Sequence, residues 1–244
     1  MSGKNKWSKY LILKRSEQLA PYLPNTKRLT RSAFWKFIEK YDHVILKPVH
    51  GSGGKGVIQV SSLGNRRCDV HREKTKKTIR GKKQTYSYVK RKIGSSDYMV
   101  QRRIHLATVH NRPFDMRIIV QRRRNSGVWT VTAKVAKVAG KGYIVTNNTR
   151  SKGTILHVKT ALRRSSLNGH SPQRLLYDVK RIALLSAKRL SAFFPRHRIY
   201  GMDMGLDENG RVWVIETNHY PAMSHFRKLG DKAMCRRILA YKKS

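Results

Sequence analysis

Acidic residues are scarce in this sequence of 244 residues. It has 13 Asp and Glu against 54 Lys and Arg, for a formal net charge of +41 at pH 7. A chain with so much positive charge repels itself, and we expect it to work beside something acidic. Nucleic acid, an anionic membrane surface, an acidic polymer or peptide, and phosphate groups all meet this expectation, and charge alone does not choose among them.

Cysteines and long apolar runs are also scarce. Cys68 and Cys235 lie far apart without the spacing of a metal site, which favours free thiols in a reducing compartment. The apolar patch near the N-terminus, Tyr10–Leu13, is too short for a signal-peptide core. No run approaches the ~18 apolar residues of a membrane span. We therefore expect a cytoplasmic protein with no membrane span.

The pattern along the chain predicts an α+β protein with mainly antiparallel strands, and 244 residues suffice for a core in one domain or two lobes. Two helical segments precede residue 43, the second with Ser32 as its expected N-cap. The clearest helix begins at Ser171-Pro172 and ends near Pro195. Strands are expected over 43–46, 57–60, 98–104, 114–123 and 128–139, with a turn near 125–127 joining the last two.

Residues 66–92 form the most basic segment, with 12 Lys and Arg against two acids. Tyr86 and Tyr88 lie among these charges. We expect exposed strand and loop here, a surface that would suit phosphates and stacked bases, or else a merely solvated one. A basic helix is expected at the C-terminus.

The segment VILKPVHGSGGKGVIQV (44–60) places glycines between two expected strands. It contains G-x-G-x-x-G, but a dinucleotide-binding fingerprint needs a helix after the glycines, and the Walker A pattern is not met. The H-R-D-x-x-x-x-N loop of protein kinases is missing from the sequence. Glycine amides can approach phosphate oxygens closely, and Lys47 adds a positive charge. We interpret the segment as a phosphate-binding flap; the alternative is an ordinary hairpin with a surface lysine.

The segment GMDMGLDENGRVWVIETNHYP (201–221) holds four of the 13 acids. Asn209-Gly210 predicts a two-residue hairpin turn, which would pair Asp207 with Val212. Continuing outward, this register places Asp203 opposite Glu216. Asn218 then projects from the same face as Glu216.

Two opposed carboxylates require compensation. At ~5 Å they repel by about 3 kcal/mol at an effective dielectric constant near 20. The oxygen ligands of Asp203, Glu216 and Asn218 suit Mg²⁺ or Mn²⁺ rather than zinc. A pair neutralised by arginine is the structural alternative.

Several of these motifs together resemble the ATP-grasp superfamily of carboxylate–amine ligases. They are Lys47 before a glycine flap and the later series Asp203, Glu216-x-Asn218 and Pro221. The sequence is also similar to the YheC/YheD family, which is named for spore-coat-associated proteins of bacilli. The similarity lies in the segments KWSKYLIL, YLPNT, ILKP, VQRRIHLATVHNRPFDMRIIVQ and GMDMGLDENGRVWVIETN. The resemblance implies an ATP-grasp fold, in which two α+β lobes with mainly antiparallel sheets grip ATP.

The resemblance also implies a division of the chain and roles for single residues. Residues 1–30 would be a helical lead-in, 31–100 the small lobe with the flap, and 101–244 the large lobe with the metal site. Arg117, in the element Asp115-x-Arg117, would act with Lys47 in catalysis, near phosphate or an acyl-phosphate. The implied ATP-binding residues are Lys6, Lys47, Gly51, Ser52, Gly53, Gly54, Gly56, Gln101, Arg102, Arg103 and Ile104; the ligands of Mg²⁺ or Mn²⁺ are Asp203, Glu216 and Asn218; the substrate residues are Arg117, Lys134, Asn218 and Ala222.

The implied reaction activates a carboxylate with ATP as an acyl-phosphate, which an amine then attacks, leaving ADP and phosphate. An acidic peptide, polymer or small carboxylate is the expected substrate, because the positive charge would hold it. The alternative is a protein that binds nucleic acid or a spore component on the same fold with weak or lost catalysis. We expect a cytoplasmic location, and the resemblance adds association with the spore as an alternative.

Three departures from the family pattern bear on the substrate. The domain that usually precedes the ATP-grasp core is missing before Lys6, so a partner protein is expected to supply part of the substrate site, unless the substrate is large. Ala222 follows Pro221 where related ligases have glycine. Gly201 stands where some peptide-forming members place an arginine, and Arg117 or Lys134 is the expected substitute.

Overall fold

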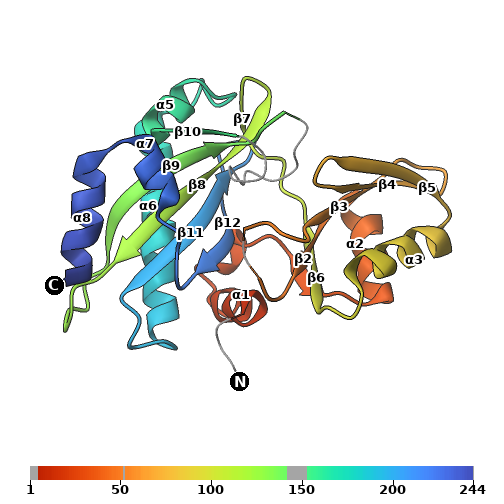
Figure 1. The fold of residues 1–244 in the computed structure, drawn as a ribbon, viewed down its shortest axis with the longest axis horizontal. Helices are drawn as coiled ribbons and strands as arrows, with labels where there is room; N and C mark the ends of the chain where they lie inside the picture. The colour runs from red at the N-terminus through yellow and green to blue at the C-terminus, as the bar shows by residue number, and fades with distance from the viewer. Residues whose placement is uncertain (1–4, 52, 142–152, 244) are drawn as a thin grey trace.

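The computed structural model describes residues 5–51, 53–141 and 153–243. These residues form two six-stranded sheets, and every paired strand in both sheets is antiparallel. Figure 1 shows the two sheets side by side along the long axis, with the helices packed on their faces. This is the α+β architecture that the sequence predicts.

The first sheet has the strand order β1-β6-β2-β3-β4-β5. Helices α2 and α3 pack on one of its faces and bury Phe34, Val89 and Ile93 there. Its elements are β1 (Thr26–Arg28), α2 (Arg31–Tyr41), β2 (His43–Pro48), β3 (Ile58–Ser62), β4 (Arg67–Arg72), β5 (Thr75–Arg80), α3 (Lys82–Ile93) and β6 (Tyr98–Arg102).

The second sheet has the order β10-β9-β8-β11-β12, with β7 paired to β8. The alternation of β8 buries Ile118 against the core on the α6 side and Ile119 against α7 and α8 on the other side. Its elements are β7 (Thr108–Val109), β8 (Arg112–Gln121), β9 (Thr130–Val138), β10 (Thr154–Leu156), α5 (Val158–Arg163), α6 (Pro172–Ser191), β11 (Ile199–Leu206), β12 (Val212–Asn218), α7 (Ser224–Leu229) and α8 (Lys232–Lys243).

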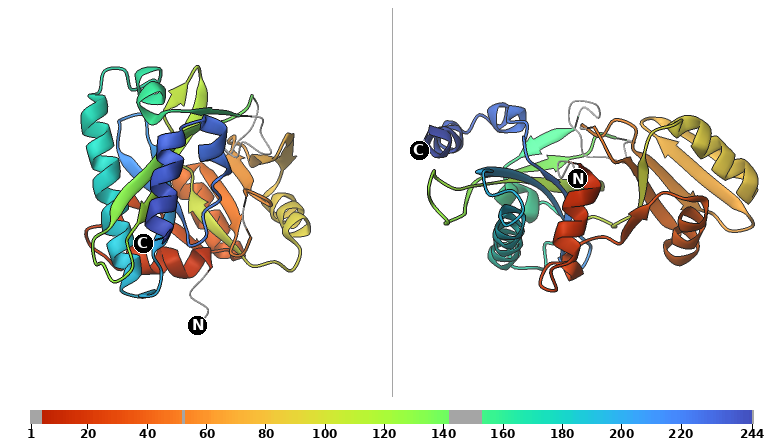
Figure 2. Two further views of the ribbon diagram at one scale, coloured as in Figure 1. Left: turned by 60° about the vertical axis from the view of Figure 1, so that its left-hand side comes forward. Right: turned by 90° about the horizontal axis from the view of Figure 1, so that it is seen from below.

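The N-terminal segment begins on the second sheet and then crosses to the first. Helix α1 (Lys6–Lys14) and the 3-10 turn η1 (Ala20–Tyr22) precede β1. Ile12 and Leu13 of α1 join the core of the second sheet, whereas β1 pairs with β6 in the first sheet. The described part of this segment, residues 5–30, therefore contacts both sheets (Figure 2).

Two local expectations differ from the structure. Residues 82–93 form helix α3 rather than loop, because Thr85, Val89 and Ile93 recur every four residues and give a buried helical face. Helix α2 is capped by Thr30, whose hydroxyl accepts from the amide of Ala33 at 3.0 Å, and Ser32 lies inside the helix. Within the described residues, no helix has the length and apolar character needed to cross a membrane.

The hairpin β11–β12 reaches the expected pairing by an unexpected route. Its loop is one residue longer than a two-residue turn, since the amide of Asp207 donates to the carbonyl of Arg211, and Leu206 pairs with Val212. A β-bulge then skips one residue of β12, so that Asp203 still lies opposite Glu216. The predicted pairing of these two acids is confirmed, whereas the predicted register near the tip is wrong by one residue.

Candidate functional site

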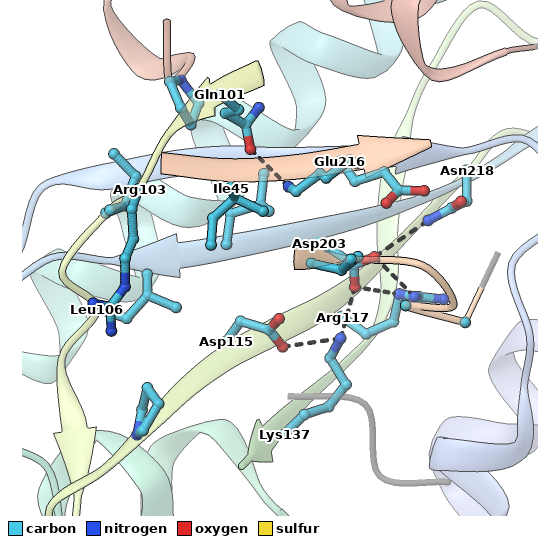
Figure 3. Close-up of a pocket in the computed structure, with 18 of the residues that line it drawn as sticks. Ile45, Gln101, Arg103, Leu106, Asp115, Arg117, Lys137, Asp203, Glu216 and Asn218 are labelled. Carbon is cyan, nitrogen blue, oxygen red and sulfur yellow. Dashed lines mark hydrogen bonds and ion pairs between the residues drawn. The ribbon is translucent and has the colours of Figure 1, made fainter. Parts of the chain in front are cut away.

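A cavity of about 680 Å³ lies between the two sheets. Strands β2 and β6 of the first sheet and β8, β9, β11 and β12 of the second contribute side chains to it (Figure 3). The predicted site residues that line it are Lys6, Lys47, Gly53, Gly54, Gln101, Arg102, Arg103, Ile104, Arg117, Asp203, Glu216, Asn218 and Ala222. The fold therefore gathers most of a set that spans more than 200 positions of the sequence.

Among the described residues, three of the predicted ones do not line the cavity. Gly51 and Gly56 lie in the glycine loop but do not line the cavity. Ser52 lies outside the described residues. Lys134 is in β9 three residues from Lys137, and residues an odd number apart on a strand point to opposite faces. Lys137 lines the cavity and Lys134 does not.

Lys47 is buried at the end of β2, where it faces the cavity. Its Nζ donates to Oε1 of Gln101 at 2.6 Å, and Nε2 of Gln101 donates to the hydroxyl of Thr26 at 2.9 Å. Burial lowers the pKa of Lys47, while the carboxylate of Glu216 acts in the opposite direction. The ammonium of Lys47 has three N–H donors, and the bond to Gln101 uses one of them. Lys47 can therefore also donate to an anionic oxygen in the cavity.

Lys6 connects the start of α1 to the glycine loop. Its Nζ donates to the carbonyl of Gly51, and its backbone amide donates to the carbonyl of Val49. The same Nζ lies 3.9 Å from Oε1 of Glu216. Lys6 thus contacts both the loop of the first sheet and a carboxylate of the second.

Asp203 is the centre of a buried charge network (Figure 3). Arg117 donates to both of its carboxylate oxygens, from Nε at 2.8 Å and from Nη2 at 2.9 Å. Lys137 donates to Oδ1 at 2.9 Å, and Nδ2 of Asn218 to Oδ2 at 3.2 Å. Burial alone would raise the pKa of Asp203, but Arg117 and Lys137 together lower it far below its ordinary value. Asp203 is therefore ionised and fully hydrogen-bonded.

Lys137 is a buried cavity residue that the sequence predictions left out. Its Nζ lies 2.9 Å from Oδ1 of Asp115 and 2.9 Å from Oδ1 of Asp203, and its side chain is only 7% exposed. Burial opposes its charge, but Asp115 and Asp203 raise its pKa. The turn expected near 125–127 could have identified Lys137. A hairpin centred on Ser126 pairs Asp115 with Lys137, and the structure shows this pairing.

The residues expected to bind a metal ion, Asp203, Glu216 and Asn218, lie together, but the oxygens of Asp203 already accept hydrogen bonds from protein side chains. The described residues contain no group of three or more His, Cys, Asp or Glu that could hold a metal ion. Asp203, Glu216 and Asn218 offer two carboxylates and an amide, which fit Mg²⁺ in chemistry. A cation at Asp203 would take the place of Arg117 or Lys137, whereas Glu216 makes a longer ion pair of 3.9 Å with Lys6.

The two ends of the cavity differ in character. Ile45 and Leu106 lie on the side of the cavity away from Asn218 (Figure 3), and Leu106 and Ile215 both lie near Gly205, so this side has an apolar lining. His225 lies near the charged end, where burial, Lys137 and Arg117 lower its pKa to about 4. The cavity thus combines an apolar slot with a strongly charged region.

Gly201 has a packing role in β11. A Cβ atom added to Gly201 would lie 2.4 Å from Cβ of Pro221 and 3.4 Å from Cδ of Arg117. An arginine side chain at this position would therefore clash with Pro221. Arg117 reaches the region from the neighbouring strand β8 instead.

Comparisons with known proteins agree with this arrangement. Residues 2–244 match the family described as YheC/D-like ATP-grasp. The chain is 30% identical over 242 residues to the endospore coat-associated protein YheD of Bacillus subtilis strain 168, covering 91% of this chain and 49% of that protein. It is 25% identical over 226 residues to YheC of the same organism, with 89% and 60% covered. The chain spans about half the length of these curated relatives.

Solved structures show the same fold. The ATP-grasp ligase PsnB, solved with a minimal precursor, matches with a TM-score of 0.56 at 15% identity, covering 100% of this chain and 62% of that chain. The N5-carboxyaminoimidazole synthase of Aspergillus clavatus, solved with ADP and an aminoimidazole ribonucleotide, matches with a TM-score of 0.52 at 11% identity, covering 91% and 45%. The expected fold is confirmed, and the chain belongs to the YheC/D-like ATP-grasp family.

Proposed function

We propose that this chain is the ATP-binding and catalytic part of a ligase that activates a carboxylate with ATP and joins it to an amine. ATP would transfer its γ-phosphoryl group to the carboxylate, giving an acyl-phosphate and ADP. The amine would then displace phosphate and form a C–N bond. The observation that carries the proposal is the cavity, where Lys6, Lys47, Arg117 and Lys137 converge with the carboxylates of Asp115, Asp203 and Glu216.

The positive side chains suit a triphosphate and a charged intermediate. Lys47 and Lys6 would bind phosphate oxygens, since each already donates to a neutral oxygen that an anion can replace or join. Arg117 would hold the transferred phosphoryl group or the acyl-phosphate, because its planar guanidinium can contact two oxygens at once. The glycine loop would cover the phosphates with Gly53 and Gly54 and exclude water.

The apolar end would take the adenine ring. Gln101, Arg102, Arg103 and Ile104 would line that pocket. In Figure 3, Ile45, Arg103 and Leu106 lie at the side of the cavity away from Asn218. Oxygen atoms of Asp203, Glu216 and Asn218 would hold Mg²⁺ or Mn²⁺. When bound, the metal ion would neutralise charge on the phosphate oxygens.

We propose an acidic peptide, polymer or small carboxylate as the substrate. The net charge of +41 supports an acidic acceptor. Tyr220, which lines the cavity and is 75% exposed, and Ala222 beside it offer a contact surface at the mouth. PsnB, of similar fold, has been solved with precursor peptide PsnA2 and AMPPNP.

Two finer points belong to the same proposal. Residues outside this chain, from a partner protein or a further domain, would complete the substrate site. The protein would act in the cytoplasm or in association with the spore, and the names of the curated relatives support the second location.

The proposal is tested by measuring phosphate release from ATP with single amino acids, glutamate-rich peptides and poly-glutamate as acceptors. We expect acceptor-dependent release by the wild-type protein and a loss of at least ~100-fold in Glu216→Gln. Glu17→Gln is the matched control, because Glu17 is an exposed residue of the N-terminal segment that does not line the cavity. Equal rates in Glu216→Gln and the wild type with every acceptor would refute the proposal.

A further inference from the structure

A second concentration of positive charge lies on helix α3 and the edge strand β5, away from the cavity. Three cations surround the ring of Tyr88. The Nζ atoms of Lys77 and Lys92 lie 5.5 and 5.4 Å from the ring centroid, and Cζ of Arg91 lies 5.7 Å from it. We name Lys77, Tyr88, Arg91 and Lys92 the Tyr88 cluster. The three cationic residues are exposed and the tyrosine is half-buried.

The charges of the Tyr88 cluster are not balanced by acids. In the described part of the chain, the ion pairs involve none of Lys77, Arg91 and Lys92. All three charges lie within 5.7 Å of one ring centroid, so they repel one another, and attraction to the ring offsets only part of this repulsion. An anion bound beside these cations would reduce the repulsion.

The Tyr88 cluster faces away from the cavity. Val44, Val60 and Val70 pair in succession across the first sheet, and Val70 pairs with Lys77. The three valines belong to the core under α2 and α3. Their neighbours on β2, Ile45 and Lys47, point the other way and line the cavity. A ligand on the Tyr88 cluster therefore leaves the cavity free.

Two further rings on the same face carry cations. The guanidinium of Arg31 lies 5.9 Å from the centroid of Tyr86, and Nζ of Lys82 lies 5.5 Å from that of Trp35. Both rings are half-buried and belong to the core under α2 and α3. This face thus alternates partly accessible aromatic rings with cations.

We propose that this face binds single-stranded nucleic acid, with Lys77, Arg91 and Lys92 contacting phosphates and Tyr88 stacking on a base. Cations beside aromatic rings serve both parts of a nucleotide, and stacking needs no particular base. An acidic peptide would form ion pairs with the cations, but its carboxylates would not stack on the aromatic rings. This activity is separate from the proposed ligase, since the two sites lie on opposite faces of the first sheet.

The test measures binding of a fluorescently labelled 20-nucleotide oligo-dT to the full chain by anisotropy over a series of salt concentrations. The variant combines Lys77→Gln, Arg91→Gln and Lys92→Gln. The matched control combines Lys232→Gln, Arg236→Gln and Lys243→Gln, which remove the same charge from exposed positions of α8, at the opposite end of the molecule from α3 (Figure 1).

We expect the Tyr88-cluster variant to bind at least ~10-fold more weakly, with a salt slope smaller by about 2, while the α8 variant stays close to wild type. Thermal melting curves of both variants should match that of the wild type. Equal weakening by the two triple variants, or binding that does not depend on salt, would overturn the proposal.

A second pair of variants separates nucleic acid from an acidic polymer. Tyr88→Leu should weaken oligo-dT binding, and Tyr88→Phe should retain it, because only phenylalanine keeps the ring. Poly-glutamate with the same number of charges should compete weakly. Full competition by poly-glutamate together with wild-type binding by Tyr88→Leu would overturn the proposal in favour of an acidic polymer. Loss of ligase activity in Glu216→Gln should leave oligo-dT binding unchanged, so the two proposals fail independently.

Discussion

Replacing Lys137 by methionine removes the ammonium that joins two buried carboxylates and keeps most of the side-chain length. The Nζ atom lies 2.9 Å from both Asp115 and Asp203. Breaking a buried ion pair by removing one partner costs about 3–5 kcal/mol, because it leaves an uncompensated charge. Asp203 keeps its two hydrogen bonds from Arg117, so we expect a loss near the lower end, ~3 kcal/mol.

The assay is urea unfolding at neutral pH, with Lys134→Met as the matched control. Lys134 is three residues away on the same strand but does not line the cavity, and burial lowers its pKa. Its replacement should therefore cost little or nothing. Added Mn²⁺ should restore part of the stability of Lys137→Met, since a divalent cation can compensate the carboxylates. Equal free energies of unfolding for the two variants would refute the role of Lys137 as the compensating charge.

Two further changes follow from the packing and charges near the cavity. Gly201→Ala should lower the free energy of unfolding by about 1–3 kcal/mol in urea titration, because its Cβ would lie 2.4 Å from Cβ of Pro221. Gly127→Ala is the control and should change the free energy of unfolding little, because a Cβ at Gly127 would have no atom within 4 Å. Burial lowers the pKa of His225 from 6.5 to about 4, so the unfolded chain binds the extra proton between these values. Stability should fall by about 1–2 kcal/mol from pH 7 to pH 4, and less in His225→Gln; an identical pH profile in that variant would contradict this assignment.

The hairpin of residues 201–221 shows how far turn chemistry carries a prediction. Asn209-Gly210 located the turn, and the pairing of Asp203 with Glu216 was correct. In the turn, Oδ1 of Asp207 accepts hydrogen bonds from the backbone amides of Asn209 and Arg211, each at 3.0 Å. These side-chain bonds, which favour a longer loop, could not be inferred from the spacing of residues in the sequence. That longer loop and the bulge in β12 shift the register in opposite directions, so the acids still meet.

Helix α3 and Lys137 were missed for different reasons. In α3, the apolar face is narrow and most of the other residues are charged or polar. This composition suggested exposed strand and loop, and the helical face became evident from its packing against the first sheet. In β9, choosing between Lys134 and Lys137 requires the pairing register with β8, and the sequence analysis did not extend the turn expected near 125–127 into that register. Segments with a strong local signal, such as α6 and the glycine loop between β2 and β3, were located correctly.

Lys6 connects the glycine loop to the charged region of the cavity. One ammonium group contacts the carbonyl of Gly51 and the carboxylate of Glu216. An anion in the cavity can join these two oxygens on the third donor of the ammonium, or it can displace the carbonyl of Gly51. If it displaces the carbonyl, anion binding and the contact with Gly51 are thermodynamically coupled, and each weakens the other by the same factor. Because α1 is packed in the core of the second sheet, the loop of one lobe is held by a helix anchored in the other.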